Sequence, residues 1–194
     1  MDSKQEVANN QGRENEKLHI YLAGPIFTTA ERDFNLKLAT LLRGKYEVWL
    51  PQEDEQELKE PREIFEKDVE GIAWADLIVA CMDGPDPDSG TSWECGCAFG
   101  LGMPVIVFRT DSRLAEAPGN GPYNLMLTQS ATAEITQPHI RIEDLAQKIC
   151  EKIDSLEGHA KLSKSLRAAR RNQLESFLTA CRLSIEFRGF SKVL

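Results

Sequence analysis

Short, wholly apolar runs separated by helical patterns constrain this chain more than any other feature of its sequence. The runs LIVACM (residues 77–82) and PVIVF (104–108) show no alternation of polar and apolar residues. Strands buried on both faces have this pattern, and they occur mainly in parallel sheets. Further strands are predicted at residues 18–24, 46–51 and 132–137. Because helical patterns separate these strands, the sequence predicts an α/β fold: a doubly wound sheet of about five parallel strands with helices on both faces.

Apolar residues three or four positions apart predict the helices between these strands. A helix is expected to begin at Pro61, since proline fits a first helical turn, and another is expected near Thr91. Residues 52–60, 83–90 and 111–124 are predicted loops, because they are rich in charged residues or in Pro and Gly. The helix side chains expected to face the core are Phe34, Leu38, Leu41, Leu42, Ile64, Phe65, Val69, Ile72, Ile142, Leu145, Ile149 and Ile153.

Two terminal segments depart from this pattern. Residues 1–17 are polar and predicted to be disordered, so the predicted folded domain spans residues 18–157. Residues 158–194 carry eight Lys or Arg against two Glu, although the whole chain has a net charge of −8. Apolar residues at helical spacing, from Leu162 to Cys181, predict a basic amphipathic helical extension. We expect it to dock on the acidic domain or on a second subunit; a basic arm for a membrane or nucleic acid is the alternative.

Composition argues against several partners and settings. The acidic net charge argues against nucleic acid, because phosphate binding needs a basic face. No run approaches the about 18 apolar residues of a membrane span, and the start of the chain has no apolar signal segment. Five cysteines, an odd number in apolar segments, indicate free thiols and a cytoplasmic location. The spacing of Cys95 and Cys97 fits no common zinc pairing, so no metal site is predicted.

Several polar residues fall at the carboxyl ends of the predicted strands, where doubly wound folds bind ligands. Tyr21 lies near the end of the first strand, Gln52 follows the second, and the acids of residues 83–88 follow the third. The chain has no glycine-rich dinucleotide signature, no Walker sequence and no Gly-x-Ser-x-Gly elbow. A group of acids and a tyrosine at one edge therefore becomes the candidate site.

Three carboxylates, Asp68, Asp88 and Glu94, suit cleavage of an acetal-like C–N or C–O bond. One ionised carboxylate would attack or stabilise the anomeric carbon, while another group protonates the leaving group. Each residue also has a plainer interpretation: Asp68 as a helix-surface acid, Asp88 as a helix N-cap, and Glu94 as an acid stabilised by the dipole in the first helical turn. The apolar side chains expected to surround Glu94 are Trp93, Cys97 and Phe99.

Four segments, in order and at sensible spacing over residues 18–156, resemble the nucleoside 2-deoxyribosyltransferase family. The family fold implied by this resemblance is a flavodoxin-like doubly wound α/β domain, in agreement with the predicted strands. The C-terminal extension and the long loop at residues 111–124 depart from the family pattern. The matching segments are IYLAGPIF (20–27), EKDVEGIAWADLIVA (66–80), DPDSGTSWECGCAFGLGMPVIVF (86–108) and PYNLM (122–126).

The resemblance implies a role for each candidate residue. Glu94 matches the nucleophile that forms a covalent deoxyribosyl intermediate, and Tyr21 matches the tyrosine that orients it. Asp68 is expected to exchange a proton with the nucleobase, and Asp88 to bind the sugar hydroxyls. Asn124 and Met126 match a pair that reaches into the neighbouring subunit's site, which implies a homo-oligomer, a dimer or a hexamer. The other residues implied to contact substrate are Gly24, Gln52 and Ser89.

The implied activity is transfer of a 2-deoxyribosyl group between nucleobases with retention of configuration, in nucleoside salvage and without a cofactor. A hydrolase of nucleoside 5′-monophosphates is the alternative; such relatives carry Ser six residues before the catalytic Glu, where this chain has Asp88. Phosphoribohydrolases fit less well, since the segment before Glu94 lacks their Gly-Gly pair. A non-catalytic nucleotide sensor stays open as a third reading. Deoxynucleosides and free nucleobases are the expected ligands, with no nucleic acid and no membrane.

Overall fold

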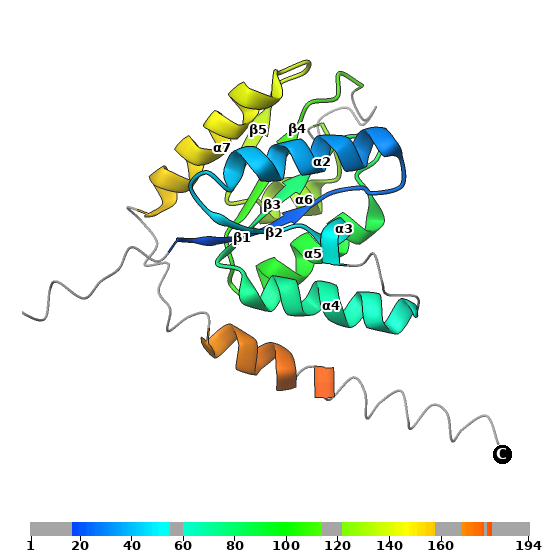
Figure 1. Ribbon diagram of the computed structural model, residues 1–194, viewed down its shortest axis with the longest axis vertical. Coiled ribbons are helices and arrows are strands. Elements are labelled where there is room, and N and C mark those ends of the chain that lie inside the picture. The colour runs from blue at the N-terminus through cyan, green and yellow to red at the C-terminus, as the bar shows by residue number, and fades with distance from the viewer. Residues whose placement is uncertain (1–16, 55–59, 114–121, 158–167, 177, 180–194) are drawn as a thin grey trace, which may run out of the picture.

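The computed structural model describes residues 17–54, 60–113, 122–157, 168–176 and 178–179. These residues form one sheet of five parallel strands in the order β2-β1-β3-β4-β5 (Figure 1). The predicted doubly wound sheet is therefore confirmed. The strands are β1 (His19–Ala23), β2 (Glu47–Trp49), β3 (Leu77–Cys81), β4 (Val105–Arg109) and β5 (Ala133–Thr136).

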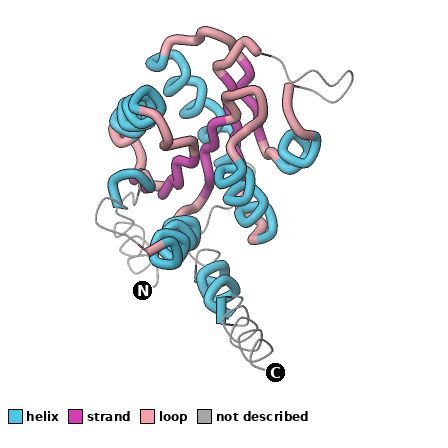
Figure 2. Tube along the Cα trace, turned by 90° about the vertical axis from the view of Figure 1, so that its right-hand side faces the viewer, coloured by secondary structure: helices cyan, strands magenta, loops and turns pink. Residues whose placement is uncertain are grey.

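Helices cover both faces of the sheet, as Figures 1 and 2 show from two sides. One face packs against α2 (Thr29–Leu42) and α7 (Ile142–Glu157). The other face packs against α4 (Pro61–Trp74), α5 (Ser89–Gly100) and α6 (Leu125–Ser130). Because both faces are covered, the central strands β3 and β4 are buried along their whole length, which explains their wholly apolar sequences.

Alternation along β1 decides which side chains meet which helices. Ile20 and Leu22 point into the core under α2 and α7, whereas Tyr21 and Ala23 point toward α4, α5 and α6. Strand β1 is central and pairs with β2 on one side and β3 on the other. The chain thus reverses its direction of winding between β1 and β3, and the carboxyl ends of these two strands flank the crevice where such folds bind ligands.

Local capping fixes where the helices begin. Thr28 and Glu31 form a reciprocal capping box at α2, with the Thr28 side chain accepting from the Glu31 amide and the Glu31 carboxylate accepting from the Thr28 amide. Asp88 caps α5 and Asn124 caps α6. Helix α4 begins at Pro61, as predicted.

Four local expectations need correction. The predicted loop at residues 52–60 begins inside a short helix, α3 (Pro51–Asp54), and helix α6 follows the predicted loop at 111–124 without having been predicted. Phe65 was expected in the core, yet it is 37% exposed and meets Trp93 edge to face, with ring centroids 5.3 Å apart. Leu41 was also expected to face inward, but it is exposed, on the outer side of α2.

The terminal predictions lie largely outside the described residues, residues 1–16 entirely so. Within the predicted extension, residues 168–176 and 178–179 are helical and lie beside α4 (Figure 1). The described cysteines, Cys81, Cys95, Cys97 and Cys150, are free thiols. Over the described ranges, no helix combines the length and the hydropathy that crossing a membrane requires.

Candidate active site

Tyr21 brings two carboxylates together beneath the crevice. Its hydroxyl lies 2.5 Å from Glu94 Oε1 and 3.2 Å from Asp68 Oδ1. The three residues come from β1, α4 and α5, and they are separated by 47 and 73 positions in the sequence from Tyr21. We call them the carboxylate–phenol cluster: Tyr21, Asp68 and Glu94.

A phenol carries one proton, so it cannot donate fully to both carboxylates. The shorter contact identifies Glu94 as the acceptor of that proton, because hydrogen bonds to ionised oxygens are short. The contact to Asp68 Oδ1 is longer and is the weaker of the two. The geometry thus places two carboxyl groups beside one hydroxyl proton.

Burial and charge keep the phenol protonated. Tyr21 is fully buried, and burial is the largest cause that raises its pKa well above the ordinary value of 10.0. The nearby charges of Glu94 and Asp68 raise the pKa further. Tyr21 therefore stays a hydrogen-bond donor throughout the physiological pH range.

Helix α5 places Glu94 differently from the sequence expectation. The helix begins at Ser89 rather than near Thr91, so Glu94 lies in the second turn and not in the first, where the dipole is strongest. The expected apolar surroundings are also wrong in part: Trp93 is 46% and Phe99 59% exposed, on the outer side of the helix. A hydrogen bond from the Tyr21 hydroxyl helps to hold this carboxylate at the site.

Asp88 is the N-cap of α5, the plainer of its two sequence interpretations. Its Oδ2 accepts from the Thr91 amide at 2.8 Å and from Thr91 Oγ1 at 3.1 Å. Both of these bonds use Oδ2, which leaves Oδ1 as the oxygen with which the carboxylate would meet a sugar hydroxyl. Ser89, the first residue of α5, is exposed next to it.

Gln52 and Gly24 have packing roles at the same edge. The buried Gln52 side chain donates through Nε2 to the Arg32 carbonyl at 2.9 Å, and this bond ties α3 to α2. A Cβ on Gly24 would lie 3.2 Å from the Cys81 Cβ and 3.3 Å from Asn35 Oδ1. Gly24 thus permits the close approach of the β1 end to β3 and α2.

Asn124 and Met126 lie at the start of α6. Asn124 caps that helix through its Oδ1, which accepts from the Met126 amide at 2.9 Å. The Met126 side chain is 71% exposed. Within the described residues, no hydrogen bond joins this pair to Tyr21, Asp68 or Glu94.

Phe27 was missed as a site residue. It follows the Gly24-Pro25 turn after β1, and its ring is 77% exposed, more than any other large apolar side chain among the described residues. An aromatic ring held open to solvent beside the crevice offers a flat apolar surface. The signal in the sequence was an aromatic residue directly after the turn that ends β1.

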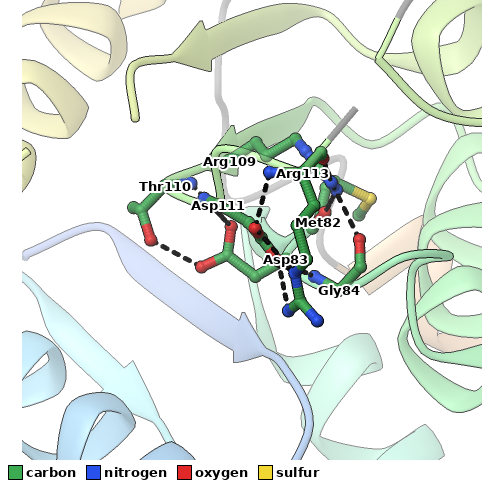
Figure 3. Close-up of polar contacts among 7 residues, drawn as sticks. All are labelled: Met82, Asp83, Gly84, Arg109, Thr110, Asp111 and Arg113. Atoms are coloured by element: carbon green, nitrogen blue, oxygen red, sulfur yellow. Dashed lines mark hydrogen bonds and ion pairs between the residues drawn. The ribbon is translucent and has the colours of Figure 1, made fainter. Parts of the chain in front are cut away.

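A second polar cluster joins the ends of β3 and β4 (Figure 3). We call it the β3–β4 end cluster. The Asp83 carboxylate accepts from the Thr110 amide and Thr110 Oγ1, both at 2.6 Å, and from the Asp111 amide at 2.9 Å. Its members are Met82, Asp83, Gly84, Arg109, Thr110, Asp111 and Arg113.

The buried guanidinium of Arg109 crosslinks this cluster. It donates to the carbonyl oxygens of Met82 and Arg113, and to that of Gly84 at 2.8 Å. These bonds hold the segment that runs from β3 to the Asp88 cap. Sequence reasoning missed Arg109, although a cation at the end of a wholly apolar strand was a visible signal.

Metal chemistry has no arranged ligand set here. Within the described ranges, no three His, Cys, Asp or Glu side chains are grouped so as to hold a metal ion.

Comparisons with known proteins agree with the fold. The family model described as "Nucleoside 2-deoxyribosyltransferase" matches residues 20–152. No curated protein matches the sequence. A solved 2-deoxyribosyltransferase from Bacillus psychrosaccharolyticus is 31% identical, with a TM-score of 0.52 over 66% of this chain and 90% of that one.

Two further structures are similar. A conserved protein from Enterococcus faecalis V583 is 27% identical, with a TM-score of 0.57 over 70% of this chain and 99% of that chain. The CMP N-glycosidase BcmB from Clostridium botulinum is 20% identical, with a TM-score of 0.51 over 69% of this chain and 98% of that one, a likeness of fold alone. Since the family model covers most of the chain, the protein belongs to the nucleoside 2-deoxyribosyltransferase family.

Proposed function

We propose that this protein transfers a 2-deoxyribosyl group from one nucleobase to another through a covalent intermediate on Glu94. The observation that carries the proposal is the Tyr21 hydroxyl in contact with two carboxylates from different helices. A double displacement at a sugar carbon needs this combination: one ionised nucleophile and one acid that is able to release a proton.

In the first step, a Glu94 oxygen attacks C1′ while the bond from C1′ to the base nitrogen breaks. The electron pair of that bond stays on the base, and Asp68 supplies the proton that neutralises it. The product is an ester between Glu94 and deoxyribose. Lack of a 2′-hydroxyl makes the oxocarbenium-like transition state easier to reach.

In the second step, a nitrogen of the incoming base attacks C1′ and displaces Glu94. Asp68 takes up the proton that this nitrogen loses, so both carboxyl groups return to their starting states. Two inversions at C1′ retain the β configuration. The steps use only side chains of the protein.

Tyr21 serves both steps as the link between the carboxyl groups. Its proton holds Glu94 in place and disperses the carboxylate charge before attack and after release. Its raised pKa keeps that proton on the phenol. When Asp68 changes between carboxylic acid and carboxylate, the hydrogen bonds of the phenol change, but the phenol itself stays protonated.

Substrate recognition is assigned to residues around the crevice. Asp88 Oδ1 would accept from a sugar hydroxyl, with Ser89 beside it, and the exposed Phe27 ring would stack on a base. Gly24 acts indirectly, because it permits the close approach of the β1 end to β3 and α2. Gln52 would meet the base only if its amide exchanged the bond to the Arg32 carbonyl for one to the ligand.

The exposed Asn124 and Met126 support a site shared between two subunits, because their side chains are free to contact a second chain. Mixed oligomers test this. Glu94→Ala and Asn124→Ala proteins, each of low activity alone, would regain activity when they are unfolded and refolded together, since a mixed oligomer contains one intact site. An active monomer in gel filtration contradicts the shared site.

A hydrolase of nucleoside 5′-monophosphates is the competing activity. The Asp88 carboxylate at the start of α5 disfavours it, because it occupies the end of the helix that would otherwise attract a phosphate. Incubation with deoxyinosine and adenine, and separately with deoxyinosine 5′-monophosphate, separates the activities. Deoxyadenosine appears in exchange, deoxyribose 5-phosphate in hydrolysis of the monophosphate, and neither in a sensor.

Peptide mass spectrometry tests the covalent step. The protein is mixed with deoxyinosine without an acceptor base, quenched in acid and digested. We expect a deoxyribosyl adduct on the peptide that holds Glu94, and none in Glu94→Ala. An adduct on another residue, or turnover by the alanine variant, refutes the assignment of the nucleophile.

A further inference from the structure

The described C-terminal helix, residues 168–176 and 178–179, lies outside the segment that matches the family model. It runs beside α4, on the outer side of the helices that carry Asp68 and Glu94 (Figure 1). Its position raises the question of what it does for the site on the inner side of the same helices.

Arg170 anchors this helix to the amino-terminal ends of the central strands. It is 6% exposed, its Nη1 donates to the Asp76 carbonyl at 3.1 Å, and its Nη2 lies 4.0 Å from Asp76 Oδ1. The other Asp76 oxygen accepts from the His19 amide at 2.9 Å, directly before β3 and at the start of β1. This buried ion pair fixes the position of the C-terminal helix, because removal of one partner would leave the other as a buried, unpaired charge.

Leu174, one helical turn after Arg170, inserts between α4 and α5. The side chain is buried and clusters with Val69 and Ala73 of α4, with Cys97 of α5 and with Leu101, the residue that caps the end of α5. Val69 adjoins Asp68 in the sequence, and Cys97 lies one turn beyond Glu94.

Hollows on both sides make Leu174 hard to replace. It lines a cavity of about 230 Å³ toward Trp49 and Trp74, and another of about 480 Å³ toward Trp93 and Cys97. Shortening this side chain therefore adds to empty space instead of letting neighbours close in, so the two helices lose a shared contact.

We propose that Arg170 and Leu174 are positioning residues for the transfer reaction, which set the separation of Asp68 and Glu94 from outside. On the inner side, the carboxyl groups share the Tyr21 hydroxyl at 3.2 and 2.5 Å. On the outer side, Leu174 contacts both helices. A small rotation of α4 against α5 lengthens one of the inner contacts, and small displacements of reacting groups cost rate steeply.

The test compares Leu174→Ala with the volume-conserving Leu174→Met, and Arg170→Gln with Arg171→Gln. Arg171 is exposed and pairs only with Glu175 of its own helix among the described contacts, so its variant is the matched control. We expect kcat for base exchange to fall about tenfold to a hundredfold in Leu174→Ala and Arg170→Gln, with little change in KM. Leu174→Met and Arg171→Gln should retain wild-type kcat.

Two readouts separate positioning from plain stability. The pH profile of kcat should shift in the two impaired variants, because the coupling between Asp68 and Glu94 changes. Cys97 should react faster with a thiol reagent, located by peptide mapping, since Leu174 covers it. A faster Cys97 reaction with unchanged kcat and pH profile overturns the inference, as does unchanged Cys97 reactivity.

The inference rests on the proposed function, and the wild-type protein distinguishes the two failures. Wild-type exchange with fully active variants overturns the positioning role alone. A wild-type protein that neither exchanges nor hydrolyses deoxynucleosides overturns the proposed function and this inference with it.

Discussion

The carboxylate–phenol cluster and the β3–β4 end cluster are both built from charged side chains at the carboxyl edge of one sheet, yet they are satisfied in different ways. In the β3–β4 end cluster, each of the carboxylates Asp83 and Asp111 accepts from amides, a hydroxyl or a guanidinium. In the carboxylate–phenol cluster, two carboxyl groups from two helices meet one hydroxyl.

The difference teaches which acids to suspect of chemistry. An acid whose oxygens are matched by fixed donors is a structural crosslink, and its charge is settled. Two acids that contact the same hydroxyl have coupled protonation states, and a proton that changes place is what acid–base catalysis uses.

The largest effect is expected for Glu94→Ala. Loss of the nucleophile should reduce base exchange by about 10⁴-fold or more, while the fold is retained because Tyr21 can donate its proton to Asp68 instead. Exchange kinetics and thermal unfolding of the same sample check both statements. Asp83→Ala in the β3–β4 end cluster should do the reverse. It should lower thermal stability strongly and the rate of base exchange by the folded protein only slightly. An equal loss of exchange activity in Glu94→Ala and Asp83→Ala would contradict the distinction between the two clusters.

Asp68→Asn sharpens the comparison, because it removes the ionisable carboxyl group and keeps the volume of the side chain. Exchange should fall about 10²- to 10⁴-fold, the usual contribution of a general acid. A 7-methylpurine deoxynucleoside, whose cationic base leaves without protonation, should react with Asp68→Asn nearly as fast as with the wild type in the first step. An equal defect with both substrates assigns Asp68 to binding or structure.

Arg109→Met disrupts the β3–β4 end cluster instead. The variant leaves the carbonyl oxygens of Met82, Gly84 and Arg113 without their buried donor, so we expect a loss of about 2–4 kcal/mol in the free energy of unfolding. Urea denaturation measures it. The exposed Arg113→Met, which removes a surface ion pair, is the matched control and should cost far less.

The smallest effect is expected for Asp111→Asn. Hydrogen bonds from Arg113 hold the pKa of Asp111 well below its ordinary value of 3.8. A depressed pKa stabilises the fold above the unfolded-state value, and this contribution is lost as the pH falls below about 4. The stability difference between wild type and Asp111→Asn should therefore be constant, below about 1 kcal/mol, at neutral pH and shrink in acid. A difference that grows in acid contradicts the sign.

Much of the fold was predictable because the apolar runs of β3 and β4 are unambiguous. Helices α3 and α6 were not, since four and six residues are too short to show a helical period. Phe65 and Leu41 were misplaced because apolar spacing cannot tell a core face from an exposed one that carries aromatic or aliphatic groups.

The site was predictable in its members rather than in its contacts. Tyr21, Asp68 and Glu94 were chosen by type, position and resemblance. The face to which Tyr21 points was not readable, because a strand buried on both sides has lost the alternation that reveals it. The sequence allowed Asp88 to be a helix cap or a site acid. The hydrogen bonds from Thr91 that identify it as a cap are visible only in the structure.

Because Tyr21 belongs to a strand paired on both sides, its amide is expected to be among the slowest in the protein to exchange with deuterium. Fraying of the sheet's outer strands leaves that residue in place. Heat inactivation should accordingly begin with the loosening of helices, while Tyr21 keeps its place in the central strand until the sheet itself unfolds.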